Sequence, residues 1–328
     1  NALEKQRTAA RETRRLGLGI MGIADMLNQL GVGYDSEQGI KIIAEVMEFI
    51  TNAAYQASAS LAAEKGASPI YLEEDYLDCP FMEAALSNET QSMIRENGIR
   101  NIAIMSIAPT GSISNIVKGI QIEGKNYIGV SGGVEPIFAL YYTRRTESFK
   151  ENEFYNVFHS TIQAYIDKMG LEEEANTADK IEDILPDYFL RTAHHIKPDK
   201  RVEIQSMIQR YIDHSISSTI NLPEDVQPEV ISDIYLKAWK KALKGVTIYR
   251  DGSRFPILST EGELTEFQRV KEKEFKISVE GNQIITANGE EIIKLPDGAL
   301  TTVYHYLKNS DLAIEEVLTN PEFEEIET

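Results

Sequence analysis

The stretch from Asn101 to Ser114 constrains the fold of this chain more than any other. It reads NIAIMSIAPTGSIS, an apolar run that breaks at Pro109 and resumes after Thr110, Gly111 and Ser112. A short apolar run bounded by proline and glycine predicts a buried strand, and the residues after the glycine predict the start of a helix. The sequence therefore predicts a strand, a tight turn and a helix in immediate succession.

The backbone of this turn is suited to binding a phosphate group. Gly111 lets a ligand approach closely, and the first amides of a helix have no partner within the helix. Together with the partial positive charge of a helix N-terminus, such amides hold a diphosphate without lysine or arginine. The alternative is that Pro-Thr-Gly-Ser only connects two elements, which is common for turns of this composition.

Four further segments stand in a fixed order around APTGSIS (Ala108–Ser114). They are ARETRRLGLGIMG (Ala10–Gly22), SGGVEPIFALYYTRR (Ser131–Arg145), SSTINLPEDV (Ser217–Val226) and LKGVTIYRDGSR (Leu243–Arg254). Together the five segments cover most of residues 5–255, and they resemble the large, catalytic subunit of ribonucleotide reductases in the form typical of the adenosylcobalamin-dependent class.

This resemblance implies an α/β fold in two parts. Residues 1–255 would supply the second half of a ten-stranded α/β barrel, and residues 256–328 a small appended α+β tail. Half a barrel leaves strand edges uncovered, which isolated domains rarely tolerate. We therefore expect either a partner that carries the N-terminal half of the barrel or self-association as a homodimer.

The resemblance also implies a function, the reduction of ribonucleotides to deoxyribonucleotides by a thiyl-radical mechanism, as in a ribonucleoside-diphosphate reductase. This chain would contribute the substrate-phosphate turn and one wall of the active site. The implied phosphate ligands are the backbone amides of the turn and the hydroxyls of Thr110 and Ser112. The residues of this expected site are Ala108, Pro109, Thr110, Gly111, Ser112 and Ile113.

The cysteine content limits what the chain can do alone. A reductase of this family uses a cysteine on a finger loop, flanked by asparagine and glutamate, and a reducing cysteine pair, whereas this chain has only Cys79, in DYLDCPF. In the family these groups precede the arginine-rich segment with which the chain begins, so the resemblance places them on a missing N-terminal part. We expect no catalytic residue in this chain and interpret Cys79 as a buried or half-buried structural thiol.

The start at Asn1 rather than methionine is consistent with one piece of a longer polypeptide, whether a split-gene product, a cleavage product or a fragment chosen for study. Family members often carry a C-terminal cysteine pair that relays electrons from thioredoxin, and this chain has none. We expect an external dithiol reductant such as thioredoxin to act by another route, or the chain not to be catalytic by itself.

Tyr249 distinguishes subclasses of the family. Reductases that take their radical from a separate subunit show adjacent tyrosines here, whereas Tyr249 is followed by Arg250. The resemblance therefore favours adenosylcobalamin, with a contact near these two residues. Two alternatives stay open, a large subunit fed by a radical-generating subunit and a non-catalytic fragment that serves in nucleotide binding or assembly.

Composition excludes several other classes. A formal net charge of −19 argues against a nucleic-acid partner, since such binding depends on lysine and arginine. No membrane span and no secretory signal are visible, and a single cysteine is typical of a reducing cytoplasm. The adjacent His194 and His195 cannot share one helix face, so we expect no metal site.

Periodicity predicts the longer elements. A helix is expected from Asp35, as its N-cap, to Gly66, with Phe49 in the core and a buried face at Ile43, Met47, Ile50, Ala54 and Leu61. A second helix is expected over Pro228–Lys244, with Ile231, Ile234, Tyr235, Ala238 and Ala242 on its buried face and Trp239 off it.

Shorter elements follow from turn residues. Residues 119–130 predict a hairpin, a strand is expected after Pro136, and residues 245–249 predict a buried strand. In the tail, residues 274–295 predict a three-stranded meander with turns at Gly281-Asn282 and Asn288-Gly289, followed by a helix over about residues 300–318.

Overall fold

A computed structural model describes residues 3–147, 152–177, 180–251, 274–279, 283–288, 292–294 and 300–303 of the chain. The chain divides into two compact units, Asn1–Ser253 and Arg254–Thr328. Each unit is described by itself.

The larger unit is organised around four extended segments that run parallel to one another in chain order. The paired residues are Leu18 with Met105, Ile107 with Ile216, and β5 (Thr219–Leu222) with β6 (Thr247–Arg250). The segment Ala103–Ile107 is bonded on both sides, since Leu16 N donates to Ala103 O at 2.9 Å and Ser217 N donates to Ile107 O at 2.8 Å. Neighbouring parallel segments need long crossover connections, which helices provide here. The expected α/β class, a partial α/β barrel, is confirmed.

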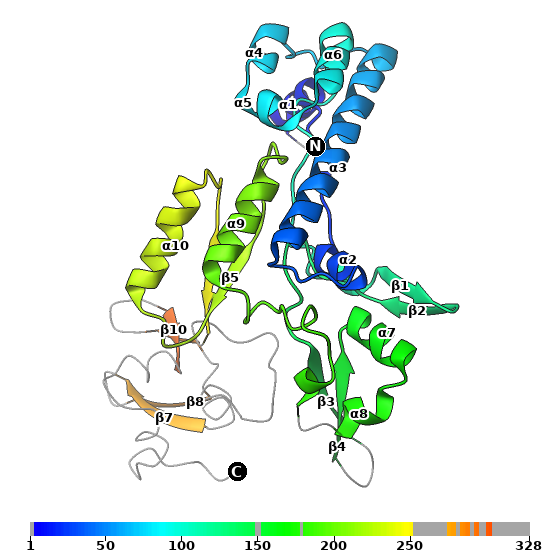
Figure 1. The fold of residues 1–328 in the computed structure, drawn as a ribbon. Coiled ribbons are helices and arrows are strands. Elements are labelled where there is room, and N and C mark those ends of the chain that lie inside the picture. The colour runs from blue at the N-terminus through cyan, green and yellow to red at the C-terminus, as the bar shows by residue number, and fades with distance from the viewer. Residues whose placement is uncertain are drawn as a thin grey trace. The chain divides into compact units, whose positions relative to one another are not determined.

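Helices connect these segments (Figure 1). The first connection contains α2 (Ile23–Gln29), α3 (Glu37–Lys65) and α6 (Asn88–Asn97), α9 (Pro198–Gln209) precedes the third segment, and α10 (Pro228–Lys240) joins β5 to β6. The other elements of this unit are α1 (Glu4–Thr13), α4 (Glu73–Leu77), α5 (Pro80–Ala85), the 3-10 turn η1 (Ile113–Asn115), β1 (Lys118–Ile122), β2 (Lys125–Ile128), β3 (Tyr141–Glu147), β4 (Asn152–Phe158), α7 (Ser160–Met169), α8 (Glu172–Thr177) and the 3-10 turn η2 (Ile181–Asp183). None of the helices in the described ranges is long and apolar enough to cross a membrane.

Helix α3 provides one side of the main core. Its N-cap is Ser36, whose Oγ accepts a hydrogen bond from Gly39 N at 3.0 Å, so the predicted cap at Asp35 was one residue early. Its buried side chains lie along one face of the helix, each with another three or four residues away: Ile43, Met47, Thr51, Tyr55, Ser58, Ala59 and Ala62.

The core positions predicted for two residues of this helix are wrong. Phe49 is 75% exposed, because it is two positions from Met47 and therefore points to the opposite side of the helix. Leu61 is 38% exposed, whereas its neighbour Ala62 is buried.

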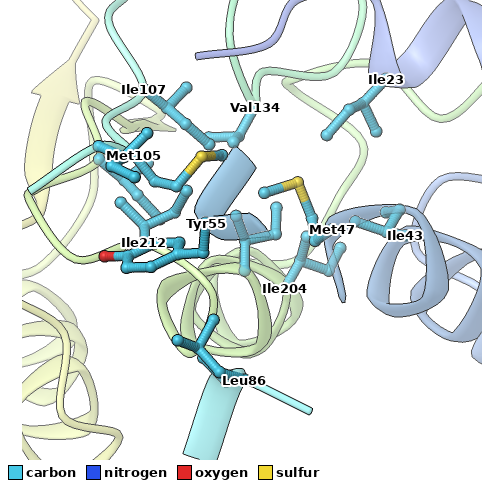
Figure 2. Packing of buried hydrophobic residues seen from close by; sticks show 14 of the residues in the cluster. Ile23, Ile43, Met47, Tyr55, Leu86, Met105, Ile107, Val134, Ile204 and Ile212 are labelled. Atoms are coloured by element: carbon cyan, nitrogen blue, oxygen red, sulfur yellow. The ribbon is translucent and has the colours of Figure 1, made fainter. Parts of the chain in front are cut away.

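The core brings together residues from distant parts of the sequence. Figure 2 shows Met105 and Ile107 of the central segment packed with Tyr55, Ile204 and Ile212. These residues come from α3, from α9 and from the chain just before the third extended segment. Their burial therefore fixes the crossover helices on the parallel segments.

The Asp213 carboxylate joins the core helix to the central segment. Its Oδ2 accepts hydrogen bonds from the Tyr55 hydroxyl and from Ile104 N at 2.7 Å, and its Oδ1 accepts one from Met105 N at 3.0 Å. Burial raises the pKa of Tyr55, and Tyr76 and Asp213 raise it further. The phenol therefore stays protonated and acts as a donor to Asp213.

Several shorter elements differ from expectation. The hairpin over residues 119–130 is confirmed as β1 and β2. The strand expected after Pro136 begins only at Tyr141, and β6 is half-buried rather than buried. Helix α10 ends at Lys240 rather than Lys244. Two residues later, Ala242 has the left-handed αL conformation (φ 57°).

The predicted face of α10 is only partly correct. Ile234 and Ala238 are buried and Trp239 is 76% exposed, as expected. Tyr235 and Ala242 are exposed. The helix packs on the sheet through a stripe narrower than the periodicity indicated.

The smaller unit contains two antiparallel pairs in the ranges described. Strand β7 (Glu274–Val279) pairs with β8 (Gln283–Asn288), and β9 (Ile292–Lys294) pairs with β10 (Leu300–Thr302). Among the described strands, β8 and β9 belong to separate two-stranded sheets, so the expected three-stranded meander was wrong. The sequence pattern identifies strands but does not choose their partners.

Part of the prediction for the tail falls on residues outside the described ranges. The expected turn residues Gly281, Asn282 and Gly289 lie outside the described residues, and Asn288 ends β8. Residues 300–302 of the expected helix form a strand, and residues 304–318 lie outside the described residues.

We predict that Asp213→Asn lowers the free energy of unfolding of the chain by about 3 kcal/mol, because the amide replaces a charged acceptor of three hydrogen bonds. Denaturant unfolding measures this change. Asp233→Asn, at an exposed position of α10, is the control and should change stability by less than about 0.5 kcal/mol. Equal effects of the two substitutions would contradict the role of Asp213.

Candidate functional site

The turn Ala108–Ile113 follows the carboxyl end of the central segment. Thr110 has a φ of +53°, in the left-handed region, where a β-branched residue is strained. Ser114 N donates to Thr110 O at 2.9 Å and closes the turn. Strain of this kind persists only where the surrounding structure enforces it.

The helix predicted after the turn is only the 3-10 turn η1. Ile116 N and Val117 N both donate to Ile113 O at 3.2 Å, and the chain enters β1 at Lys118. The apolar residues of this stretch are largely exposed, Ile113 at 49% and Ile116 at 75%. A longer helix would have no core to pack against here, so the helix dipole expected from sequence is reduced to one turn.

The turn still presents backbone amides to solvent. The N–H groups of Gly111, Ser112 and Ile113 precede the first amide bonded within the turn, that of Ser114. All three residues are exposed, and a Cβ on Gly111 would meet no atom within 4 Å. An anion can therefore approach the backbone here without displacing protein atoms.

A second loop, Ser131–Glu135, packs directly on this turn, and we call it the glycine loop. Gly133 N donates to Thr110 Oγ1 at 2.8 Å. A Cβ on Gly132 would lie 2.6 Å from Pro109 O, and one on Gly133 would lie 2.7 Å from Ala108 O. Both positions therefore require glycine because two backbones meet.

Glu135, at the end of the glycine loop, forms an ion pair with Arg201 of α9, whose side chain is 4% exposed. The nearby Tyr34 hydroxyl donates to Val134 O. Burial raises the pKa of Tyr34 to about 12, with Arg201 opposing the rise and Glu135 adding to it. Glu135 directly precedes Pro136, and no sequence signal indicated that its partner lies on α9.

The other end of the glycine loop is held by Asp25 of α2. Asp25 Oδ2 accepts a hydrogen bond from Ser131 N at 2.6 Å, and Oδ1 accepts one from the Thr161 hydroxyl. His159 Nδ1 lies 3.5 Å from Oδ1, and burial lowers the pKa of His159 while Asp25 opposes this. Asp25 and Thr161 also line a pocket of about 340 Å³ beside β1.

Tyr249 and Arg250 lie apart from the Ala108–Ile113 turn. They end β6, where Tyr249 is in register with Asn221, so β5 and the residues before it separate them from the central segment. Arg250 Nη1 donates to Glu224 O at 3.4 Å.

A small polar cluster follows β6. Burial raises the pKa of Asp251, with His194 opposing and Glu224 adding to the rise. The His194 ring packs edge-on against Phe138 with centroids 5.1 Å apart.

Cys79 is exposed, which corrects the expectation of a buried or half-buried thiol. It is the N-cap residue of the short helix α5 and directly precedes Pro80. Tyr76 donates to Ile102 O at 3.0 Å, so this region lies at the amino end of the central segment. The Ala108–Ile113 turn lies at its carboxyl end.

Metal ligation has no visible basis in the described ranges, where no three His, Cys, Asp or Glu side chains are grouped as ligands. His194 is exposed, and His195 Nδ1 lies 2.8 Å from Thr192 Oγ1.

The geometry describes parallel extended segments with crossover helices and a candidate anion site at the carboxyl end of the central segment. Comparison with known proteins identifies the family. The family described as "Ribonucleotide reductase, barrel domain" matches residues 1–249. The chain belongs to this family.

Among curated relatives, the vitamin B12-dependent ribonucleoside-diphosphate reductase of Mycobacterium tuberculosis (strain CDC 1551 / Oshkosh) is 30% identical over 259 residues, which cover 75% of this chain and 32% of the relative. A protein of the same description from Thermoplasma acidophilum is 32% identical over 282 residues, covering 83% of this chain and 33% of the relative. The chain thus spans about a third of the length of these relatives.

A solved structure has a similar fold. The alpha subunit of the class Id ribonucleotide reductase of Actinobacillus ureae aligns with a TM-score of 0.51 at 22% identity, over 75% of this chain and 40% of that chain. This likeness concerns the fold alone.

We predict that Gly132→Ala lowers the free energy of unfolding by about 2 kcal/mol, because its Cβ would lie 2.6 Å from Pro109 O. Denaturant unfolding measures the change. Gly245→Ala is the matched control, since a Cβ there meets no atom within 4 Å and its φ is not positive. A Gly132 variant as stable as the control would refute the close approach of the two loops.

We predict that His159 makes the chain less stable in acid. Burial lowers the pKa of His159 in the folded chain. The stability that the neutral imidazole contributes is therefore fully present above the ordinary histidine pKa of about 6.5, and it is lost as the pH falls through the lower pKa of the folded state. His159→Gln should flatten the decline in unfolding free energy between about pH 7 and pH 5. The exposed His195→Gln is the control, and an unchanged slope for His159→Gln would refute the prediction.

Proposed function

We propose that this chain forms the substrate-phosphate side of a ribonucleotide reductase, and that the whole enzyme reduces ribonucleotides to deoxyribonucleotides. The observation that carries the proposal is the exposed Ala108–Ile113 turn at the carboxyl end of the central segment. Ligand sites of parallel α/β folds lie at this end of the strands. The relatives named ribonucleoside-diphosphate reductases support a diphosphate substrate.

In this proposal the turn binds phosphate oxygens through N–H groups. The amides of Gly111, Ser112 and Ile113 and the hydroxyl of Ser112 are the donors. The Thr110 Oγ1 accepts from Gly133 N, so its own proton is available to a phosphate oxygen. Ala108 and Pro109 lead the chain into the turn. Neutral donors suit an acidic chain of net charge −19, since they bind an anion locally without a basic surface.

The names of the relatives also support adenosylcobalamin as the cofactor. Three residues of the chain suit the nucleoside part of such a group, because Phe138 and His194 offer aromatic rings and Asp251, after β6, offers a carboxylate acceptor. When bound, the cofactor supplies radical chemistry. The residues of this chain would orient its nucleoside part near Tyr249 and Arg250.

The thiol chemistry belongs to another part of the enzyme in this proposal. Cys79 lies at the amino end of the central segment, away from the turn. The radical and redox cysteines would come from the N-terminal half, with an external dithiol such as thioredoxin as reductant, in the cytoplasm. A neighbour is also supported by the first extended segment, where Leu16 and Leu18 are 52% and 45% exposed. A homodimer would cover the same residues.

A second candidate is a non-catalytic fragment that binds nucleotide or assists assembly. The single cysteine favours it, because Cys79 lies at the amino end of the central segment, away from the turn. A large subunit fed by a radical-generating subunit is less favoured, because arginine follows Tyr249.

Deoxynucleotide formation tests the proposal. The purified chain is incubated with adenosylcobalamin, a dithiol and a ribonucleotide, with and without any polypeptide encoded immediately upstream. We expect turnover only with the upstream polypeptide. Turnover by the chain alone would refute the assignment of the radical thiol to another part, and no turnover in either case would favour the binding fragment.

We predict that Ser112→Ala raises the KM for the ribonucleotide about tenfold in the active assembly, because one hydroxyl donor to a phosphate oxygen is lost. The exposed Ser92→Ala on α6 is the control and should leave KM unchanged. Steady-state kinetics measure both variants. An unchanged KM for Ser112→Ala would remove Ser112 from the phosphate site.

A further inference from the structure

The strained turn Ala108–Ile113 and the glycine loop are in direct contact. Gly133 N donates to Thr110 Oγ1 at 2.8 Å, and the backbone at Gly132 lies against Pro109 O. Thr110 keeps a φ of +53° although it is β-branched. A residue in this conformation needs contacts that hold it there, and the glycine loop supplies them.

Glu135 fixes the glycine loop to two other elements. Its Oε2 pairs with Arg201 Nη2 of α9, and its Oε1 accepts a hydrogen bond from Thr219 N of β5 at 2.8 Å. Within the loop, Glu135 N donates to Gly132 O at 2.8 Å. One carboxylate therefore ties the loop to a helix and to the sheet.

Arg201 is held as firmly as the carboxylate it pairs with. The same Nη2 lies 3.0 Å from Thr219 O and 3.2 Å from Ser218 Oγ, and the side chain is 4% exposed. The Glu135 side chain is 27% exposed, so the ion pair is only partly buried. An ion pair of this kind adds little net stability over apolar packing, and its main effect is the arrangement it imposes.

We propose that Glu135 and Arg201 are positioning residues for the phosphate site. Their ion pair holds the glycine loop against the turn, keeps Thr110 in its left-handed conformation and thereby sets the affinity of the turn for phosphate. This inference rests on the proposed function, because it assigns a role relative to the Ala108–Ile113 turn.

The test compares two variants with a control in the full chain. Glu135→Gln removes the carboxylate charge, and the double variant Glu135→Gln/Arg201→Gln also removes the guanidinium that would otherwise be buried without its partner. Glu203→Gln is the control, because it removes the same charge from a half-exposed ion pair with Lys200 on the same helix.

Two quantities are measured for each protein. Hydrogen exchange without ligand reports the protection of peptides that cover residues 108–115 and 131–136. Calorimetric titration with ADP and with inorganic pyrophosphate reports phosphate affinity. Circular dichroism confirms that each variant is folded, and the double variant keeps the test informative if the single variant unfolds.

We expect faster exchange in both peptides and about tenfold weaker binding of ADP in the Glu135 variants, and neither change in Glu203→Gln. Unchanged exchange in a folded Glu135 variant would overturn the inference, as would faster exchange with unaltered affinity. Failure of the unsubstituted chain to bind either probe would overturn the phosphate site itself and the affinity role with it. Failure of the phosphate site can be distinguished from failure of the ion pair to hold the loop, because hydrogen exchange is measured without ligand.

Discussion

The central segment Ala103–Ile107 is bonded through its backbone to a parallel neighbour on each side, and the larger unit depends on this double pairing. Parallel neighbours require crossovers, so the pairing explains why long helices lie between the extended segments. The Asp213 carboxylate reinforces it by accepting hydrogen bonds from Ile104 N, Met105 N and the Tyr55 hydroxyl. The segment therefore provides a fixed base for the turn Ala108–Ile113 that follows it.

The candidate site is built where two loops meet rather than within one motif. The turn alone has a strained Thr110 and a single 3-10 turn in place of a helix. The glycine loop supplies what the turn lacks, since Gly132 and Gly133 allow its backbone to touch that of Pro109 and Ala108. Asp25 holds one end of this loop and Glu135 the other. Rigid support of this kind is what an anion site made of backbone amides requires, because amides select an anion only through their fixed directions.

Sequence reasoning was most successful where a pattern is local. Helix α3 and the hairpin β1–β2 follow from spacing and turn residues, and five ordered segments identified the family that residues 1–249 match. It was least successful where exposure depends on distant residues. Phe49 and Cys79 are apolar residue types that the fold leaves exposed, and periodicity does not reveal which apolar residues find a neighbour.

The sequence by itself determined the family, the alternation of helices and extended segments, and the position of the turn, because these depend on residue types at short spacing. Only the tertiary structure decided that Glu135 meets Arg201, 66 positions away, and that Gly133 meets Thr110, 23 positions away. It also decided that the turn leads into a 3-10 turn and that β9 pairs with β10. The physical reason is that such contacts depend on how separate elements pack, and no local pattern records which distant surface will fill a given space.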